Sequence, residues 1–338
     1  MGLKAKGKQS STSRRISARH FQGALDRWFR KHGRDLPWRK TRDPYAILVS
    51  EIMLQQTQVT SVIPYYNEWL RRFPDISAVA RSRKTDILHA WQGLGYYSRA
   101  HNLHRSAKMV VRRFAGKLPR DPLELQSLPG IGRYTANAIG VFAFDQSLPI
   151  VETNTARVLA RLLNIRDPVD SKSGRLKLWN ASATLTPHCG ARQFQSAMMD
   201  LGVLVCTARD PRCPICPVKG FCKAPYPGSL PVKKRQPPRL AMAESHSFIV
   251  KRDAILLERC RDRWAGMWML PRKRTPATDP IHTAKFAFTN HTVTLRIFPG
   301  GRRRLNSVQR WFPIRQLQRI PIPSPHRRAI ASLLTASR

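Results

Sequence analysis

The chain has 338 residues, enough for one large or two ordinary domains, and it carries 60 Lys and Arg against 20 Asp and Glu, a formal net charge of +40. An excess of this size predicts a polyanionic partner, because each phosphate that is neutralised releases a condensed counterion. The longest apolar runs, such as 138–144, are too short to span a bilayer, so nucleic acid is the favoured partner and no membrane is expected.

Residues 1–19 form a polar, Ser-rich stretch with six Lys or Arg and no acid. A solvated disordered tail, an arm that touches DNA and a transit peptide all have this composition. The stretch has no apolar core of the kind found in secretory signals, so we expect a cytoplasmic protein associated with the nucleoid, or a nuclear one, and not a secreted one. In those compartments a disulfide framework for the six cysteines is disfavoured.

The region 20–224 is predicted to be a helical domain with short connections. Apolar residues recur at helical spacing in 45–53, 158–163 and 197–205, and β-branched alternation is rare. Residues 225–244 are predicted to be a linker, because their first part is rich in proline and contains Lys-Lys-Arg.

The remainder, 245–338, is predicted to be a small α+β domain. Its strand-like segments are 247–250, 254–257, 286–289 and 293–298, and a last helix is predicted near 325–334.

One carboxyl group interrupts the apolar helix predicted at 45–53. Glu51 stands among Ile and Leu side chains, where desolvation disfavours the ionised form and is expected to raise its pKa. A carboxyl that stays protonated near neutral pH can act as a general acid. A glutamate at the solvent edge of its helix is the alternative, and this segment alone does not decide between the two.

The segment Leu-Pro-Gly-Ile-Gly-Arg-Tyr-Thr-Ala, 128–136, lies between two helical stretches. Gly130 and Gly132 permit a tight turn and leave backbone N–H groups pointing outward at a helix N-terminus, which suits a DNA phosphate. A plain corner between two helices is the alternative. In itself the motif indicates contact with a DNA backbone without readout of base sequence.

A second carboxylate, Glu152, is predicted just before an amphipathic helix. There the helix dipole and the free N–H groups favour the ionised form, although a simple helix cap has the same pattern. Cleavage of a glycosidic bond needs one protonated and one ionised carboxyl: the acid activates the leaving base, and the anion stabilises an oxocarbenium-like sugar. Neither glutamate by itself favours a catalytic role over a structural one. The catalytic interpretation is favoured only because the glycine segment and the cysteines occur in the same chain.

The helical region ends in a group of cysteines with the spacing C-x6-C-x2-C-x5-C. They are Cys206, Cys213, Cys216 and Cys222. Four soft thiolates so close in sequence can wrap one ion or cluster, and one 4Fe–4S cluster is expected. Zinc is the alternative, but zinc sites usually show two close pairs of ligands. The basic residues between the cysteines, Arg209, Arg212 and Lys219, are expected to face a DNA backbone.

Several segments carry a resemblance to a known family. They are Ser-Glu-Ile-Met-Leu-Gln-Gln-Thr-Gln-Val from 50, Gly-Leu-Gly-Tyr-Tyr-Ser-Arg-Ala from 93, the glycine segment from 128, Met-Met-Asp-Leu-Gly from 198 and the cysteine spacing. Together they resemble the adenine DNA glycosylases of the MutY family, in the helix-hairpin-helix, endonuclease III-like superfamily. The resemblance implies a mainly α helix-hairpin-helix glycosylase domain with an iron–sulphur loop, plus a small α+β Nudix-like C-terminal domain. It also implies an enzyme that acts as a monomer on double-stranded DNA and hydrolyses the N-glycosidic bond of adenine mispaired with 8-oxoguanine or guanine.

The resemblance further implies roles for particular positions. Glu51 matches the residue that protonates adenine N7, Glu152 the catalytic anion, and Asn154 a helper beside the catalytic acid. Tyr134 stands where bifunctional lyases carry a Schiff-base lysine, which implies a monofunctional glycosylase. The positions that match residues inserted into the base stack are Gln55, Gln56, Thr57, Leu94 and Tyr96. The positions expected to line the adenine pocket are Arg34, Trp38 and Gln195.

The C-terminal part resembles the family's Nudix-like lesion-sensing domain through Arg-Trp-Ala-Gly-Met-Trp-Met-Leu-Pro from 263 and Phe-Thr-Asn-His from 288. Phe288 and Thr289 match the loop that inspects 8-oxoguanine. The region lacks the Glu-rich metal box of a Nudix hydrolase, so it is expected to bind and not to hydrolyse. Its acids from Lys251 onward are Asp253, Glu258, Asp262 and Asp279.

Three positions depart from the family pattern, and one of them is Ala156, where the family commonly has a basic residue. The family has Asp where this chain has Glu152, and a methylene displaces a carboxylate by more than catalytic geometry usually tolerates. Asn290 stands at a loop position where the family has His, and His291 follows it. Two alternatives therefore remain open: a mismatch thymine or uracil glycosylase of the same superfamily, and a lesion-binding protein whose catalysis is weakened by the change at Glu152.

Overall fold

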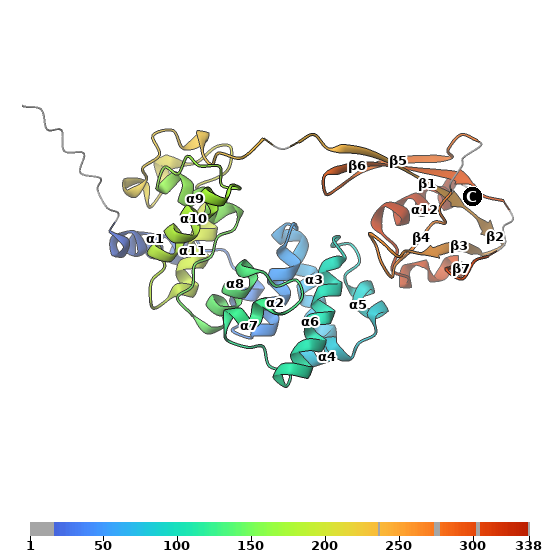
Figure 1. Ribbon diagram of the computed structural model, residues 1–338, viewed down its shortest axis with the longest axis horizontal. Coiled ribbons are helices and arrows are strands. Elements are labelled where there is room, and N and C mark those ends of the chain that lie inside the picture. The colour runs from blue at the N-terminus through green and yellow to red at the C-terminus, as the bar shows by residue number, and fades with distance from the viewer. Residues whose placement is uncertain (1–16, 236, 274–277, 302–304, 337–338) are drawn as a thin grey trace, which may run out of the picture. The chain divides into compact units, whose positions relative to one another are not determined.

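The computed structural model describes residues 17–235, 237–273, 278–301 and 305–336 (Figure 1). The chain forms two compact units, each built from separate stretches of sequence. One unit comprises 1–35 and 140–234, and the other comprises 36–139 and 235–338. The helical region predicted at 20–224 is therefore shared between the two units. Most of the predicted basic tail lies outside the described residues, and the first helix begins at Ala18.

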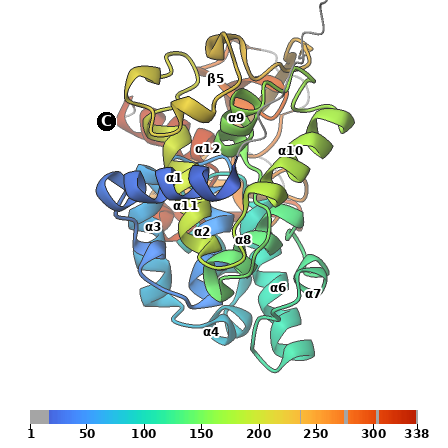
Figure 2. The ribbon, with the colours of Figure 1, turned by 90° about the vertical axis from the view of Figure 1, so that its left-hand side faces the viewer.

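The first unit is a group of packed helices. They are α1 (Ala18–His32), α9 (Thr153–Leu162), α10 (Lys172–Leu185) and α11 (Ala191–Leu204). Figure 2 shows these helices together, and α11 contacts both α1 and α9. Phe21 and Leu25, one helical turn apart on α1, are fully buried in a core that includes Leu159 and Leu201. This core supports the start of α9 and the cysteine segment that follows α11.

The second unit has its own helical part, built around a central helix. Its members are α2 (Pro44–Leu54), α3 (Val59–Arg72), α4 (Ile76–Arg81), α5 (Lys84–Ala90), α6 (Ser98–Phe114) and α7 (Pro122–Gln126), with most of α8 (Arg133–Phe144). Asp43 begins α2 by accepting hydrogen bonds from the backbone nitrogens of Tyr45 (3.0 Å) and Ala46 (3.3 Å), and Pro44 suits the first helical position. Every residue from Tyr45 to Met53 is buried, so α2 is enclosed on all sides.

The C-terminal stretch of the second unit contains two small sheets and a helix. In the first sheet β6 (His291–Pro299) lies between β1 (Leu240–Phe248), which is parallel to it, and β5 (His282–Phe288), which is antiparallel. In the second sheet β3 (Ala254–Arg259) pairs with β2 (Val250–Lys251), β4 (Trp268–Met269) and β7 (Gln309–Pro313). The helix α12 (Ser324–Ala336) contributes Ile330 to a core shared with Leu257 and Leu295.

The predicted elements correspond to observed ones except at the linker and at 247–250, which was predicted as one strand but is divided between the end of β1 and the start of β2. The helices predicted at 45–53, 158–163 and 197–205 lie in α2, α9 and α11. The segment predicted as a linker, 225–244, contains the first residues of β1, because Leu240 pairs with His291 of β6. This pairing involves residues far apart in the sequence, so the local composition could not reveal it. Among the described residues, no helix is both long and apolar enough to cross a membrane.

Candidate active site and cysteine loop

Glu51 is buried on the central helix α2, with 5% of its surface exposed. Its neighbours in sequence, Ser50 and Ile52, are buried as well, so no edge of this helix segment faces water. The alternative of a glutamate at a solvent edge is therefore excluded. The burial is what the predicted role of a general acid requires, and that role stays our expectation.

The segments predicted to insert into the base stack are held by a buried arginine of α6. Arg99 is 7% exposed and donates hydrogen bonds to the end of α2 and to the turn before α6. Its acceptors are the carbonyl oxygens of Ile52 (3.0 Å), Met53 (2.7 Å), Gln55 (2.5 Å), Leu94 (2.9 Å) and Gly95 (3.1 Å) and the hydroxyl of Thr57 (3.1 Å). Burial lowers the pKa of Arg99 to about 10. Arg99 was not predicted as a functional residue, although an arginine on the apolar face of an amphipathic helix could have indicated a buried structural role.

Four of the five predicted stack-inserting residues lie at or near the surface. Gln56 and Tyr96 are exposed and both have positive φ angles, 61° and 48°. Gln55 and Thr57 are half-buried. Leu94 is only 6% exposed, so its side chain belongs to the core in this conformation. Their contact with DNA stays a prediction.

The predicted glycine hairpin is formed by α7, a turn and α8. Asp121 begins α7 by accepting a hydrogen bond from the Leu123 nitrogen (3.1 Å). In the turn Gly130 has a φ of +79°, and a Cβ atom there would stand 2.7 Å from the Cβ of Asn102, so only glycine fits. At Gly132 an added Cβ would meet no atom within 4 Å, and this residue is exposed. The open space beside a helix N-terminus is what a phosphate oxygen requires.

Tyr134 lies in the first turn of α8, directly after this hairpin, and is half-buried. It belongs to the same unit as Glu51. A tyrosine carries no amine, so this position cannot form a Schiff base with an abasic sugar.

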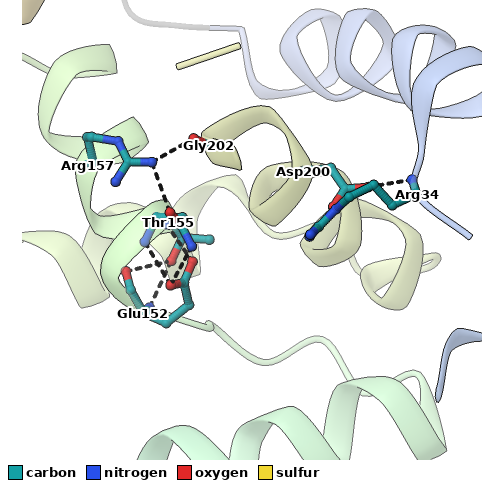
Figure 3. Close-up of polar contacts among 7 residues, drawn as sticks. Arg34, Glu152, Thr155, Arg157, Asp200 and Gly202 are labelled. Atoms are coloured by element: carbon teal, nitrogen blue, oxygen red, sulfur yellow. Dashed lines mark hydrogen bonds and ion pairs between the residues drawn. The ribbon is translucent and has the colours of Figure 1, made fainter. Parts of the chain in front are cut away.

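Glu152 is the N-cap of α9 and makes a complete capping box (Figure 3). Its carboxylate accepts hydrogen bonds from the backbone nitrogens of Asn154 (2.7 Å) and Thr155 (2.8 Å) and from the side-chain amide of Asn154 (3.1 Å). In return the Glu152 nitrogen donates to the hydroxyl of Thr155 (2.8 Å).

The direction of the pKa shift at Glu152 differs from the expectation. Burial raises the pKa of this carboxyl above its ordinary value, and the hydrogen bonds from Asn154 and Thr155, which lower it, offset only part of that effect. The cap was predictable because it is local. The hydrogen bonds of the cap lower the pKa, as expected, whereas the larger effect of desolvation depends on how the rest of the unit encloses the carboxyl and was not predicted.

A chain of hydrogen bonds connects Glu152 with the first cysteine. The Asn154 side-chain oxygen accepts from Arg157 Nη2 (2.9 Å), which also donates to the carbonyl of Gly202 (2.6 Å, Figure 3). Arg157 Nε donates to the carbonyl of Cys206 (2.8 Å). The catalytic candidate and the cysteine loop are therefore joined through one buried arginine.

The cysteine segment also accepts hydrogen bonds from Arg161, which lies one helical turn after Arg157 on α9. Arg161 is 1% exposed. Its donors reach Cys206 Sγ (3.3 Å) and the carbonyl oxygens of Thr207 (2.6 Å), Ala208 (3.1 Å) and Leu230 (2.9 Å). Neither Arg157 nor Arg161 was predicted to matter, although two arginines four residues apart on the buried face of a helix could have been noticed.

The four cysteines of the predicted cluster are half-buried, free of disulfides and close enough to influence one another. Burial raises the pKa of the Cys216 thiol to about 11, and the other three sulphurs add to the rise. As a donor set they fit an iron–sulphur cluster, because soft thiolates are its usual ligands. Within the described ranges, however, no three His, Cys, Asp or Glu side chains are grouped so that they could hold a metal ion. The basic residues of the loop, Arg209, Arg212 and Lys219, are all exposed.

The predicted adenine-pocket residues are not brought together in one unit. Arg34 forms an ion pair with the buried Asp200 of α11 (2.7 Å, Figure 3). Gln195, also on α11 and 1% exposed, donates to the hydroxyl of Thr186 (2.9 Å). Trp38 is in the other unit, where its ring packs edge-on against another aromatic side chain. Arg34 and Gln195 thus have structural contacts, and a role in binding adenine stays a prediction.

The predicted lesion-inspecting residues lie where β5 turns into β6. Phe288 ends β5 and pairs in register with His291, so Thr289 and Asn290 form the turn. Thr289 has a φ of 48° and is exposed, as is Asn290. The turn borders a cavity of about 570 Å³ within the C-terminal stretch of the unit.

A glycine-containing turn between two helices is the arrangement expected of the helix-hairpin-helix class of DNA repair proteins. The model of the HhH-GPD superfamily of base excision DNA repair proteins matches residues 49–181. A thermostable thymine-DNA glycosylase of known structure is similar with a TM-score of 0.57 and 28% identity, over 61% of this chain and 95% of that one.

Similarity to curated relatives identifies the family within this superfamily. An adenine DNA glycosylase of Mycobacterium tuberculosis is 42% identical over 205 residues, which is 60% of this chain and 67% of the relative. Another, from Buchnera aphidicola subsp. Baizongia pistaciae, is 40% identical over 205 residues, 60% of this chain and 58% of the relative. This chain belongs to the adenine DNA glycosylase family of the HhH-GPD superfamily. It spans somewhat less than two thirds of the length of the Buchnera relative.

Proposed function

We propose that this chain excises adenine paired with 8-oxoguanine or guanine in double-stranded DNA by hydrolysing the N-glycosidic bond. The observation that carries the proposal is the burial of Glu51, a carboxyl enclosed in an otherwise apolar helix. Ionisable side chains are rarely buried to this degree, and where they are, a chemical role is a common reason. The names of the relatives support adenine as the base.

In the proposed mechanism Glu51 donates its proton to the extruded adenine and makes the base a better leaving group. The carboxylate of Glu152, held by Asn154 and Thr155, stabilises the positive charge that develops on the sugar. With tyrosine at 134 in place of an amine, water completes the reaction, and a monofunctional hydrolase is expected. Because burial raises the pKa of Glu152, its ionised form must be maintained by the hydrogen bonds of the cap.

We infer that Cys206, Cys213, Cys216 and Cys222 hold one 4Fe–4S cluster. When bound, such a cluster cross-links its loop and stabilises the local fold. The loop would then present exposed Arg209, Arg212 and Lys219 to the phosphate backbone. Iron and acid-labile sulphide in a brown purified protein, about four of each per chain, are the expected result; one zinc ion and no iron would contradict it.

Duplex DNA is the proposed partner, and the net charge of +40 supports it. Recognition of the base opposite adenine is assigned to Phe288 and Thr289 at the exposed turn between β5 and β6. Such an enzyme would act wherever the cell keeps its DNA, in the nucleoid or the nucleus.

The test is a single-turnover incubation of the full chain with duplexes that contain A:8-oxoguanine, A:G, T:G or U:G, followed by alkali to reveal abasic sites. Release of adenine from the first two duplexes is expected. Cleavage at T:G or U:G alone would identify a mismatch pyrimidine glycosylase, and tight binding without any product would identify a lesion-binding protein.

The matched variant for this assay is Glu51→Gln, which keeps the size and removes the transferable proton. It is expected to bind the A:8-oxoguanine duplex as the unaltered chain does, while the rate of adenine release falls by more than about 100-fold. Normal turnover by this variant would show that the general acid is another residue.

A further inference from the structure

The cavity beside the turn between β5 and β6 is lined in part by a charge pair that is largely shielded from water. Among its lining residues are Glu244 of β1, Arg263 from the loop before β4, and Phe288 at the end of β5. Arg263 and Glu244 form an ion pair through Nη2 and Oε1, and their side chains are only 15% and 19% exposed. A pair so removed from water is costly unless its members make further contacts.

Arg263 makes those further contacts with aromatic rings. Its guanidinium carbon lies 4.5 Å from the centre of the Trp264 ring and 4.6 Å from the centre of the Phe288 ring. The ring of Phe286 is also near, at 5.9 Å. Trp264 is 7% exposed, so its ring is buried in the core. The ring of Phe288 belongs to the residue that precedes the turn. The guanidinium of Arg263 therefore connects the ring of Phe288 to a buried ring of the core.

The geometry of this contact restricts the ring of Phe288. A planar guanidinium attracts an aromatic face through the ring quadrupole, and the attraction depends on where the cation sits over the ring. Glu244 holds the guanidinium from β1, a strand that does not pair with β5. The position of Phe288 thus depends on a charge pair that the turn itself does not contain.

We propose that Arg263, held by Glu244, is a positioning residue that sets the discrimination between 8-oxoguanine and guanine opposite adenine. The inference rests on the proposed function. The two bases differ at two ring positions only, so the preference depends on small displacements of the inspecting side chains. A ring of Phe288 that is free to reorient contacts both bases about equally well.

The variants are Arg263→Met, which keeps the length and removes the cation, Arg263→Lys, which keeps the charge without the planar group, and Glu244→Gln. The matched control is Arg310→Met. Arg310 is exposed on β7, and its guanidinium lies 5.7 Å from the ring of Phe312, so this variant loses the same charge and a similar contact away from the turn. Circular dichroism and thermal melting first establish that each variant is folded.

The quantity measured is the ratio of single-turnover adenine release, with A:8-oxoguanine over A:G, at subsaturating enzyme. Arg263→Met is expected to lower this ratio about tenfold, which corresponds to about 1.4 kcal/mol of lost preference. Arg263→Lys and Glu244→Gln are expected to lower it by less, and Arg310→Met to leave it unchanged. The proposal is overturned if folded Arg263→Met keeps the ratio of the unaltered chain; should that variant not fold, an unchanged ratio in Glu244→Gln overturns it.

A second readout does not depend on activity. With 4-fluorophenylalanine placed at 288, the ¹⁹F resonance is expected to shift and broaden in Arg263→Met and to stay in place in Arg310→Met. An unchanged resonance in Arg263→Met contradicts the positioning role. If the unaltered chain releases adenine from neither duplex, the proposed function fails, whereas the ¹⁹F experiment still tests the contact between Arg263 and Phe288.

Discussion

A single arginine holds together the two segments assigned to DNA contact. Arg99 reaches six acceptors between Ile52 and Gly95, and none of them is on its own helix. Because its planar group donates in several directions at once, a lysine cannot replace it. One side chain therefore fixes the backbone of both segments through its hydrogen bonds.

Arg99→Lys is therefore expected to lower the free energy of unfolding by about 3 kcal/mol, since it leaves several buried carbonyl oxygens without donors. Denaturant titration of the full chain measures this. Arg105→Lys, on the exposed side of the same helix α6, serves as the control and is expected to change stability by less than about 0.5 kcal/mol. Equal effects from the two variants would mean that the contacts of Arg99 contribute little.

The raised pKa of Glu152 has a consequence for the pH dependence of catalysis. Only the ionised carboxylate stabilises a cationic sugar, so the rate of adenine release is expected to fall as the pH drops through the pKa of Glu152. Because burial raises that pKa, the fall begins at a higher pH than for an exposed glutamate. Single-turnover rates with saturating duplex across the acidic range measure the profile. Glu152→Gln, which cannot ionise, is expected to lose this pH dependence together with most of its activity, and a profile unchanged in the variant would exclude the role.

At the scale of elements, the two glycines of the hairpin between α7 and α8 differ in what the fold requires of them. Gly130 has a positive φ and no room for a side chain, whereas Gly132 has room and no positive φ. The first glycine is required by the fold. The fold does not require the second glycine, and the contact with a DNA phosphate predicted for it is what a substitution there would test.

Two alanine variants test this difference. Gly130→Ala is expected to lower the free energy of unfolding by about 1–3 kcal/mol through backbone strain and contact with Asn102. Gly132→Ala is expected to leave stability nearly unchanged but to weaken duplex binding roughly fivefold, about 1 kcal/mol, because its methyl group occupies the space of a phosphate oxygen. Thermal melting and fluorescence anisotropy distinguish the two; full duplex affinity in Gly132→Ala would remove the hairpin from the DNA interface.

At the scale of the whole molecule, the two units each combine stretches that are distant in sequence, since 36–139 interrupts the first unit. Glu51 and the glycine hairpin belong to one unit, and Glu152 and the cysteines belong to the other. The residues assigned to the proposed chemistry are therefore distributed over both units. The excess of basic residues extends through the chain, so attraction to DNA is a property of the molecule as a whole.

Duplex affinity is accordingly expected to fall steeply with salt. For about six to ten phosphate contacts the loss between roughly 50 and 200 mM salt is about 10³ to 10⁵-fold. Anisotropy titrations at several salt concentrations give the slope, and the single-turnover rate at saturating enzyme serves as the control, because chemistry after binding releases no counterions. A loss of less than about tenfold would mean that few of the basic residues meet phosphates.

The sequence by itself determined the features that depend on near neighbours. The burial of Glu51 follows from an apolar helix, the cap of Glu152 from its place before α9, and the turn at Gly130 from its glycine. Tertiary structure alone decided the partners of Arg99, the raised pKa of Glu152, the start of β1 at Leu240 and the contact of Arg263 with Phe288. Each of these joins residues from separate elements, and such interactions arise only when folding brings the elements together, whereas caps, turns and apolar helices are formed by residues a few positions apart.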